Sequence, residues 1–153
     1  MPTTKTQTLT ILSPEFENEG NIPSKYTCEG DGVNPPLAIA NMPETTKSIA
    51  IIAEDPDATK GTFDHWLVWN IPPAESIKEN NNAGTAGKNS SGKTGYYPPC
   101  PPSGSHRYYF HVYAVDVEID LKAGADKPSL KKAIEAHIIA EGTIMGRYKK
   151  ANG

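Results

Sequence analysis

The sequence has few of the residues that mark nucleic-acid-binding or membrane-spanning proteins. Only two of its 153 residues are arginines, and 15 basic against 18 acidic side chains give a net charge of −3. This balance lacks the basic footprint that duplex binding needs. No apolar run approaches the roughly 18 residues that a membrane-spanning helix requires. We therefore expect no nucleic-acid partner and no transmembrane segment.

Cysteine is also scarce. The two cysteines, Cys28 and Cys100, are too few for a disulfide scaffold and lack the spacing of a zinc motif. The first residues contain no apolar segment of the roughly 7–15 residues found in a signal peptide, so we expect a cytoplasmic protein. Reduced thiols are the ordinary state in that compartment. A bridge between the two cysteines stays open, because sequence separation does not fix their distance.

Turn-forming residues, in contrast, are abundant, with 13 glycines and 14 prolines. This excess favours a single domain over residues 1–153 that has many turns and few long helices. Residues 78–105 form an unusually long connection. Its first part, 80–95, is rich in asparagine, glycine and serine and is predicted to be flexible. Its second part, 96–104, is dense in tyrosine and proline and is predicted to be stiff, with a shape set by what it packs around.

Four segments show the patterns of β-strands. They are residues 8–13, 48–54, 65–71 and 107–117. The second is continuously apolar, as in a strand covered on both faces, and the fourth is rich in tyrosine and valine. One amphipathic helix is predicted to begin near Pro128 and to continue through Ile138, with Gly142 as its C-terminal cap residue. This order predicts a mainly β fold with helical cover.

Polar residues stand at the ends of the predicted strands. Asp55 ends the apolar strand, while His65 and His106 each begin a strand. Period-two alternation places His106 and Tyr108 on one strand face and His111 on the other. Each residue also has an ordinary structural explanation, because aspartates at strand ends often form turns and histidines among aromatic residues often serve in packing. A functional interpretation therefore rests on their combination.

That combination resembles the signature of the phosphatidylethanolamine-binding protein family, above all its bacterial and archaeal Raf kinase inhibitor-like branch. The resemblance is carried by Asp-Pro-Asp-Ala at 55–58, His-Trp-Leu-Val-Trp-Asn-Ile at 65–71 and Pro-Pro-Ser-Gly-Ser-His-Arg-Tyr at 101–108. Residues 22–30 and 34–37 are also similar, so the resemblance covers nearly the whole chain. It implies two antiparallel β-sheets with Greek-key connections and a few short peripheral helices.

The resemblance also implies a small cavity that binds phosphate-like or carboxylate anions or a phospholipid headgroup, without a cofactor or a metal. The positions that match the family's ligand-binding residues are Asp55, Asp57, His65, Pro101, Pro102, His106 and Tyr108. Residues 144–148 match the segment that closes the cavity mouth. Relatives that inhibit kinases or serine proteases imply a protein target of that kind, and small prokaryotic relatives imply a homodimer.

A physical mechanism follows for such a cavity. Asp55 is expected to hold a protonated histidine, either His65 or His106, whose second nitrogen donates to the anion. The Tyr108 hydroxyl adds a neutral donor. Binding is then expected to weaken as the pH rises.

Three alternatives use the same segments. The first is a hydrolytic or acid–base enzyme, which we do not favour because no Gly-x-Ser-x-Gly nucleophile motif is present. The second is a metal site made of two histidines and one carboxylate. The third is a protein-docking role for the exposed loop 78–104. The composition of residues 80–95 argues against this role, because it is typical of a loop that is only flexible.

Overall fold

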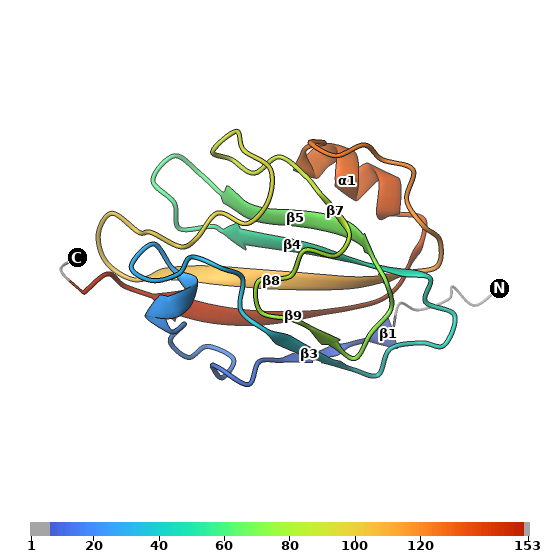
Figure 1. The fold of residues 1–153 in the computed structure, drawn as a ribbon, viewed down its shortest axis with the longest axis horizontal. Helices are drawn as coiled ribbons and strands as arrows, with labels where there is room; N and C mark the ends of the chain where they lie inside the picture. The colour runs from blue at the N-terminus through green and yellow to red at the C-terminus, as the bar shows by residue number, and fades with distance from the viewer. Residues whose placement is uncertain (1–6, 152–153) are drawn as a thin grey trace.

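The strands of the protein form two sheets (Figure 1). The structure is a computed structural model that describes residues 7–151. The larger sheet has the strand order β1-β9-β8-β4-β5-β7 and the smaller has the order β2-β3-β6. The strands are β1 (Gln7–Thr8), β2 (Thr10–Leu12), β3 (Leu37–Ala40), β4 (Ser48–Asp55), β5 (Phe63–Ile71), β6 (Ser76–Ile77), β7 (Thr85–Ala86), β8 (His106–Val115) and β9 (Ile138–Tyr148). A 3-10 turn, η1 (Ser24–Tyr26), and one helix, α1 (Lys127–Ile134), are the helical elements within residues 7–151.

Strand pairing is antiparallel except for the short parallel contact between β1 and β9. The predicted mainly β fold with two sheets and helical cover is therefore confirmed. The four predicted strands correspond to β1 with β2, β4, β5 and β8. Their apolar and aromatic runs suit strands whose side chains reach the core.

The six-stranded sheet lies between two hydrophobic layers. Ile51 of β4 packs between the sheets with Ile39 of β3. Its neighbour Ile52 points to the other face and packs beneath α1 with Leu130 and Ile134. Because successive side chains of a strand alternate between faces, the middle of a strand at this position must be apolar on both faces. This explains why β4 is apolar from Ile49 to Ala53 and why its acidic residues, Glu54 and Asp55, stand at its end.

The helix is shorter than predicted, and Gly142 is not its cap. Asp126 caps α1 by accepting a hydrogen bond from the Ser129 backbone N–H, and the helix ends at Ile134. Ile138 already belongs to β9, in which Gly142 pairs with Val112 of β8. The prediction was wrong because the apolar spacing continues past the helix by coincidence, while the long ladder with β8 satisfies the backbone of this segment. No helix in the described range 7–151 has the length and apolarity to cross a bilayer.

Two connections also differ from expectation. Cys28 and Cys100 form a disulfide, with their Cα atoms 5.4 Å apart. The expectation of reduced thiols was therefore wrong for this structure, and the alternative of a bridge between the two cysteines is the one observed. The fold brings the η1 loop against the segment before β8, where the Cys28 N–H donates to the Pro99 carbonyl at 3.0 Å. The segment 80–95, predicted to be flexible, is tied to β5: β7 pairs with it, and the Ser90 N–H donates to the Asp64 carbonyl.

Gly142→Ala is expected to lower the free energy of unfolding by about 1–3 kcal/mol. A Cβ atom there would overlap the Leu9 carbonyl oxygen and press on Cγ1 of Ile11 at 3.0 Å. This backbone cannot withdraw without losing the hydrogen bond from the Leu9 N–H to the Glu141 carbonyl. Urea denaturation measures the change. Glu141→Gln, an exposed neighbour in β9, is the control and should stay within about 0.5 kcal/mol of the unsubstituted protein. Equal stabilities for the two variants would contradict the argument.

Candidate functional site

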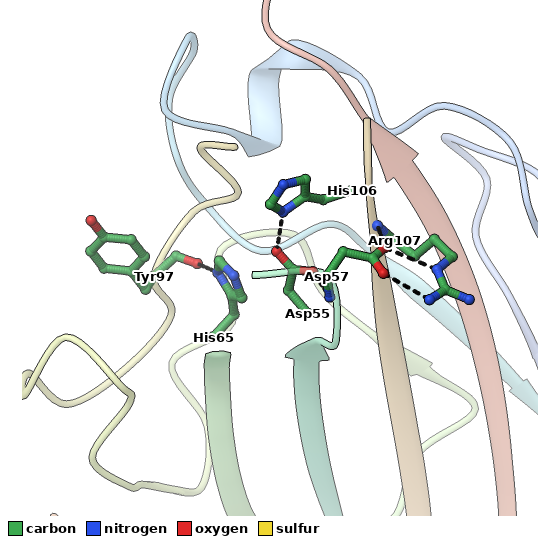
Figure 2. Close-up of polar contacts among 6 residues, drawn as sticks. All are labelled: Asp55, Asp57, His65, Tyr97, His106 and Arg107. Atoms are coloured by element: carbon green, nitrogen blue, oxygen red, sulfur yellow. Dashed lines mark hydrogen bonds and ion pairs between the residues drawn. The ribbon is translucent and has the colours of Figure 1, made fainter. Parts of the chain in front are cut away.

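The sheet topology gathers the ends of three neighbouring strands at one edge. β4 lies between β5 and β8 and runs antiparallel to both. Asp55 at the end of β4 therefore pairs with Phe63 at the start of β5. His65 follows two residues later, and His106 begins β8 (Figure 2). Residues that lie 51 positions apart in the chain, Asp55 and His106, come into direct contact in this way.

A cavity of about 470 Å³ opens at this edge of the sheet. Six of the seven expected residues lie on its wall, namely Asp55, His65, Pro101, Pro102, His106 and Tyr108. The remaining wall residues are Ala58, Thr59, Lys60, Gly61, Thr62, Phe63, Ser90, Tyr97 and Cys100. The wall is thus built from the strand ends, the β4–β5 connection and the segment before β8.

Asp55 and His106 form the buried polar pair of the cavity. Oδ2 of Asp55 lies 2.6 Å from Nδ1 of His106, and the two side chains are 4% and 10% exposed. Oδ1 of Asp55 accepts a hydrogen bond from the Asp57 backbone N–H at 2.8 Å. Asp55 is therefore both a turn residue and a histidine partner. His106 lies on the cavity wall, and within residues 7–151 its Nε2 has no hydrogen-bond partner.

His65 has a different environment from His106. Its Nδ1 lies 2.7 Å from the Tyr97 carbonyl oxygen, to which the ring N–H donates. Burial lowers the pKa of His65, and the Tyr97 carbonyl and the charge of Asp55 offset that shift only in part. A neutral ring that donates through Nδ1 carries a lone pair on Nε2. Of the two histidines considered from sequence, the structure pairs His106 with Asp55.

Tyr108 connects the two histidines. Its ring centroid lies 5.2 Å from that of His65 and 6.4 Å from that of His106. Burial raises the pKa of Tyr108 far above its usual value, and the charge of Asp55 adds to this, so the hydroxyl stays protonated as a donor. The side chain is buried, and the hydroxyl makes no hydrogen bond to any other described residue.

The structure does not bring Asp57 to the cavity wall. Its carboxylate binds the Arg107 guanidinium twice, through Oδ1 to Nη2 at 2.7 Å and Oδ2 to Nε at 2.9 Å. Oδ2 also accepts the Arg107 backbone N–H at 2.9 Å (Figure 2). The guanidinium lowers the pKa of Asp57 to about 2. Asp57 therefore fastens the β4–β5 connection to β8 and acts as a positioning residue.

Residues 144–148 do not close the cavity mouth as expected. They belong to β9 and pair with β8, where Tyr148 stands opposite His106, and the cavity wall includes none of them. The segment from Cys100 to Pro102 and the β4–β5 connection line the cavity instead. Residues 144–148 are held beside β8 by the ladder and do not reach over the cavity.

Sequence reasoning missed the wall residues of the β4–β5 connection. Lys60 is the basic residue of the wall, and Phe63 packs its ring 4.7 Å from that of His65 and 5.3 Å from that of Tyr97. A signal was present: a connection that begins after Asp55 and ends before His65 must cross the same edge of the sheet. Gly61, with φ of +103°, allows the turn in this connection.

The geometry also bears on the enzyme and metal alternatives. Within residues 7–151, no group of three or more His, Cys, Asp or Glu side chains is arranged to hold a metal ion. In the same range, no serine, threonine or cysteine side chain hydrogen-bonds to His65 or His106. The nucleophile–base contact that a hydrolytic mechanism uses is thus not formed by the described residues.

Comparison with known proteins identifies the family. The family model for phosphatidylethanolamine-binding protein matches residues 12–149. The chain belongs to the phosphatidylethanolamine-binding protein family. A UPF0098 protein of Pyrococcus abyssi is 46% identical over 150 residues, which cover 91% of this chain and 84% of the relative. One from Methanothermobacter thermautotrophicus is 41% identical and matches over 93% of this chain and 99% of the relative.

Another relative is considerably longer. The UPF0098 protein of Archaeoglobus fulgidus is 45% identical over 153 residues. The match covers 95% of this chain, which spans only 52% of the length of that relative. The family resemblance predicted from the sequence motifs is confirmed by these matches.

Solved structures of the phosphatidylethanolamine-binding protein family share the fold. A homologue from Chlamydia trachomatis superposes with a TM-score of 0.90 at 38% identity, covering 94% of this chain and 99% of its own. YbcL of E. coli, described as a new member of the mammalian family, gives a TM-score of 0.83 at 27% identity, with 93% and 98% covered. The two-sheet family fold implied by the motifs is therefore confirmed.

Asp57→Asn is expected to lower the Tm at pH 7 by about 2–4 °C, because it weakens the ion pair that fastens the β4–β5 connection. The folded-state pKa of Asp57, about 2, lies below its ordinary value of 3.8. The stabilisation is therefore complete at neutral pH and is lost as the pH falls from about 4 to 2. Thermal denaturation at pH 7 and pH 3 tests this, with the exposed Asp31→Asn as control. A Tm difference that is as large at pH 3 as at pH 7 would overturn the assignment.

Proposed function

We propose that the cavity binds a small phosphate-like anion through His106, Tyr108 and His65. One observation supports this most. Three buried side chains meet at the cavity, and within the described residues His106 Nε2, His65 Nε2 and the Tyr108 hydroxyl have no hydrogen-bond partner. Among residues 7–151 none of these three atoms counts as a fully enclosed polar atom without a partner, so each stays accessible from the cavity and can bond to a ligand there.

His106 supplies the charged donor in this proposal. When the imidazole is protonated, Nδ1–H binds Asp55 and Nε2–H donates to an anionic oxygen. The Asp55 carboxylate balances the imidazolium charge in this buried place. The Tyr108 hydroxyl donates a second hydrogen bond, and Lys60 at the wall attracts the anion.

His65 favours an anion that carries a hydroxyl group. Because the neutral ring donates through Nδ1 to the Tyr97 carbonyl, its Nε2 accepts a hydrogen bond. Hydrogen phosphate and a phosphomonoester monoanion offer both anionic oxygens and an O–H. A carboxylate or the phosphodiester group of a headgroup offers acceptors only. At the anionic group itself, the donor and acceptor set therefore fits a phosphomonoester better than a carboxylate or a phosphodiester.

The expected affinity is modest. A hydrogen bond to a charged group contributes about 1.5–3 kcal/mol, from which the cost of ordering the ligand is subtracted. Two or three such bonds in an open cavity correspond to a dissociation constant of roughly millimolar size. The site suits a ligand present at high concentration or one held by further contacts.

A protein target, a homodimer and a cytoplasmic location stay predictions that follow from the family resemblance and the sequence. A kinase or protease target would meet the same donors if it presented a phosphorylated side chain. The non-enzymatic role likewise stays a prediction, consistent with an Asp55–His106 pair that has no side-chain nucleophile beside it among residues 7–151.

Anion binding is expected to weaken as the pH rises from 5 to 8.5, because imidazole groups in general lose their proton in this range and a neutral ring whose Nδ1–H binds Asp55 has no N–H donor at Nε2. Sulfate is a suitable probe because its charge does not change over this range, so NMR titration with sulfate reports on the protein alone. His106→Ala should weaken binding about 10-fold or more at pH 5.5. His111→Ala is the matched control, because His111 lies on the opposite face of β8 and bonds to Thr143. Equal affinity at pH 5 and pH 8.5 would contradict the mechanism.

Methyl phosphate is expected to bind about 2- to 10-fold more tightly than dimethyl phosphate at pH 5.5, because only the monoester has an O–H for His65. The second ionisation of a phosphomonoester lies near pH 6, so both ligands then carry close to one negative charge. His65→Phe, which keeps a ring but lacks the acceptor, should abolish the preference. Tighter binding of the diester would instead support a phospholipid headgroup.

A further inference from the structure

We propose that the Cys28–Cys100 disulfide is a redox-sensitive latch that holds the rim of the cavity in place. Cys100 lies on the cavity wall and is followed there by Pro101 and Pro102. Cys28 belongs to the loop after η1, which is not part of the wall. This inference deepens the proposed function: the latch acts on the same cavity, and its effect on ligand affinity rests on that function.

The rim segment, residues 100–105, has few other attachments. Within residues 7–151, no backbone or side-chain hydrogen bond involves any residue of this segment. The segment begins after Pro99, whose carbonyl accepts the Cys28 N–H, and it ends where β8 begins at His106. Pro101 is its buried residue, and the others are exposed. The disulfide is therefore the strongest tie inside the rim segment.

The opposite end of the disulfide is firmly held. In the loop that carries Cys28, the Thr27 N–H donates to the Ser24 carbonyl, the Gly30 N–H to the Thr27 carbonyl and the Gly32 N–H to the Lys25 carbonyl. Glu29 also accepts a hydrogen bond from the Tyr148 hydroxyl of β9. Opening the disulfide is thus expected to release the rim segment, while the Cys28 loop stays where it is.

Contacts other than the disulfide also hold the two loops together. The Tyr96 hydroxyl donates to the Tyr26 carbonyl at 2.9 Å, and the Cys28 N–H donates to the Pro99 carbonyl at 3.0 Å. Both contacts join the same two loops just outside the rim segment. They can persist in the reduced protein, so the change should be confined to residues 100–105.

The disulfide is open to chemical reduction. Both cysteines are exposed, and exposed disulfides are among those that small dithiols reduce. A thiolate of the dithiol attacks one sulfur and forms a mixed disulfide, and the other cysteine leaves as a thiolate that takes up a proton. The second thiol of the reagent then displaces the first cysteine. Two electrons and two protons pass to the protein, and the dithiol becomes a cyclic disulfide.

NMR relaxation tests the latch without a ligand. Backbone ¹⁵N order parameters of Ser103, Gly104 and Ser105 are compared between the oxidised protein and the protein reduced with dithiothreitol. They should fall below about 0.6 on reduction and return on reoxidation, while those of Gly30 and Gly32 stay unchanged. Unchanged values in the rim segment would overturn the latch. Loss of the whole native spectrum on reduction would also overturn it, since the proposed change is local.

Titration with inorganic phosphate tests the link to the cavity. The affinity for phosphate should fall about 5-fold or more on reduction. The rim segment is then no longer ordered in the free protein, so ordering it costs free energy when phosphate binds. The double variant Cys28→Ser/Cys100→Ser should bind like the reduced protein and should not respond to dithiothreitol. A loosened rim with equal affinity in both states would overturn control of the cavity. A loosened rim with no phosphate binding in either state would contradict the proposed function and still support the latch.

Discussion

The antiparallel pairing of β4 with both β5 and β8 is the constraint on which the candidate site depends. Neighbouring antiparallel strands run in opposite directions, so the end of β4 meets the beginnings of β5 and β8. Asp55, His65 and His106 are brought together by the sheet itself. Since β4 is covered on both faces, its side chains are apolar from Ile49 to Ala53, and the acidic residues follow at the cavity edge. The same burial that stabilises the sheet therefore restricts where its polar residues can stand.

Fold and site are also coupled through the energetics of Asp55 and His106. A buried carboxylate is costly unless it is paired and hydrogen-bonded. Asp55 has both kinds of partner, the His106 imidazole on one oxygen and the Asp57 N–H on the other. The turn after β4 and the start of β8 are thus fixed by one side chain. The Asp57–Arg107 ion pair joins the same two segments at the outside of the site, where solvent weakens it.

The limits of sequence-based prediction follow from the range of the interactions. Long apolar and aromatic runs are local signals, and they predicted β4, β5 and β8 together with the polar residues at their ends. β9 was missed because it is specified by a ladder with β8 that no local pattern reveals. The role of Asp57 depends on Arg107, 50 residues away, and the disulfide depends on a distance between two loops. Which histidine pairs with Asp55 is decided by side-chain geometry that motif spacing does not contain.

In the proposed function, the carboxylate on the cavity wall couples anion binding to proton uptake. Asp55 and Lys60 are the charged wall residues apart from the histidines, and their charges cancel. The wall therefore becomes positive only when a histidine takes up a proton, and His106 is the one that has a carboxylate to balance that charge. Linkage is reciprocal, so an anion that binds the protonated state also favours protonation. Cys100, Pro101 and Pro102 line the same cavity, so under the proposed redox latch a loosened rim admits more water, and water weakens the attraction between the imidazolium and the anion.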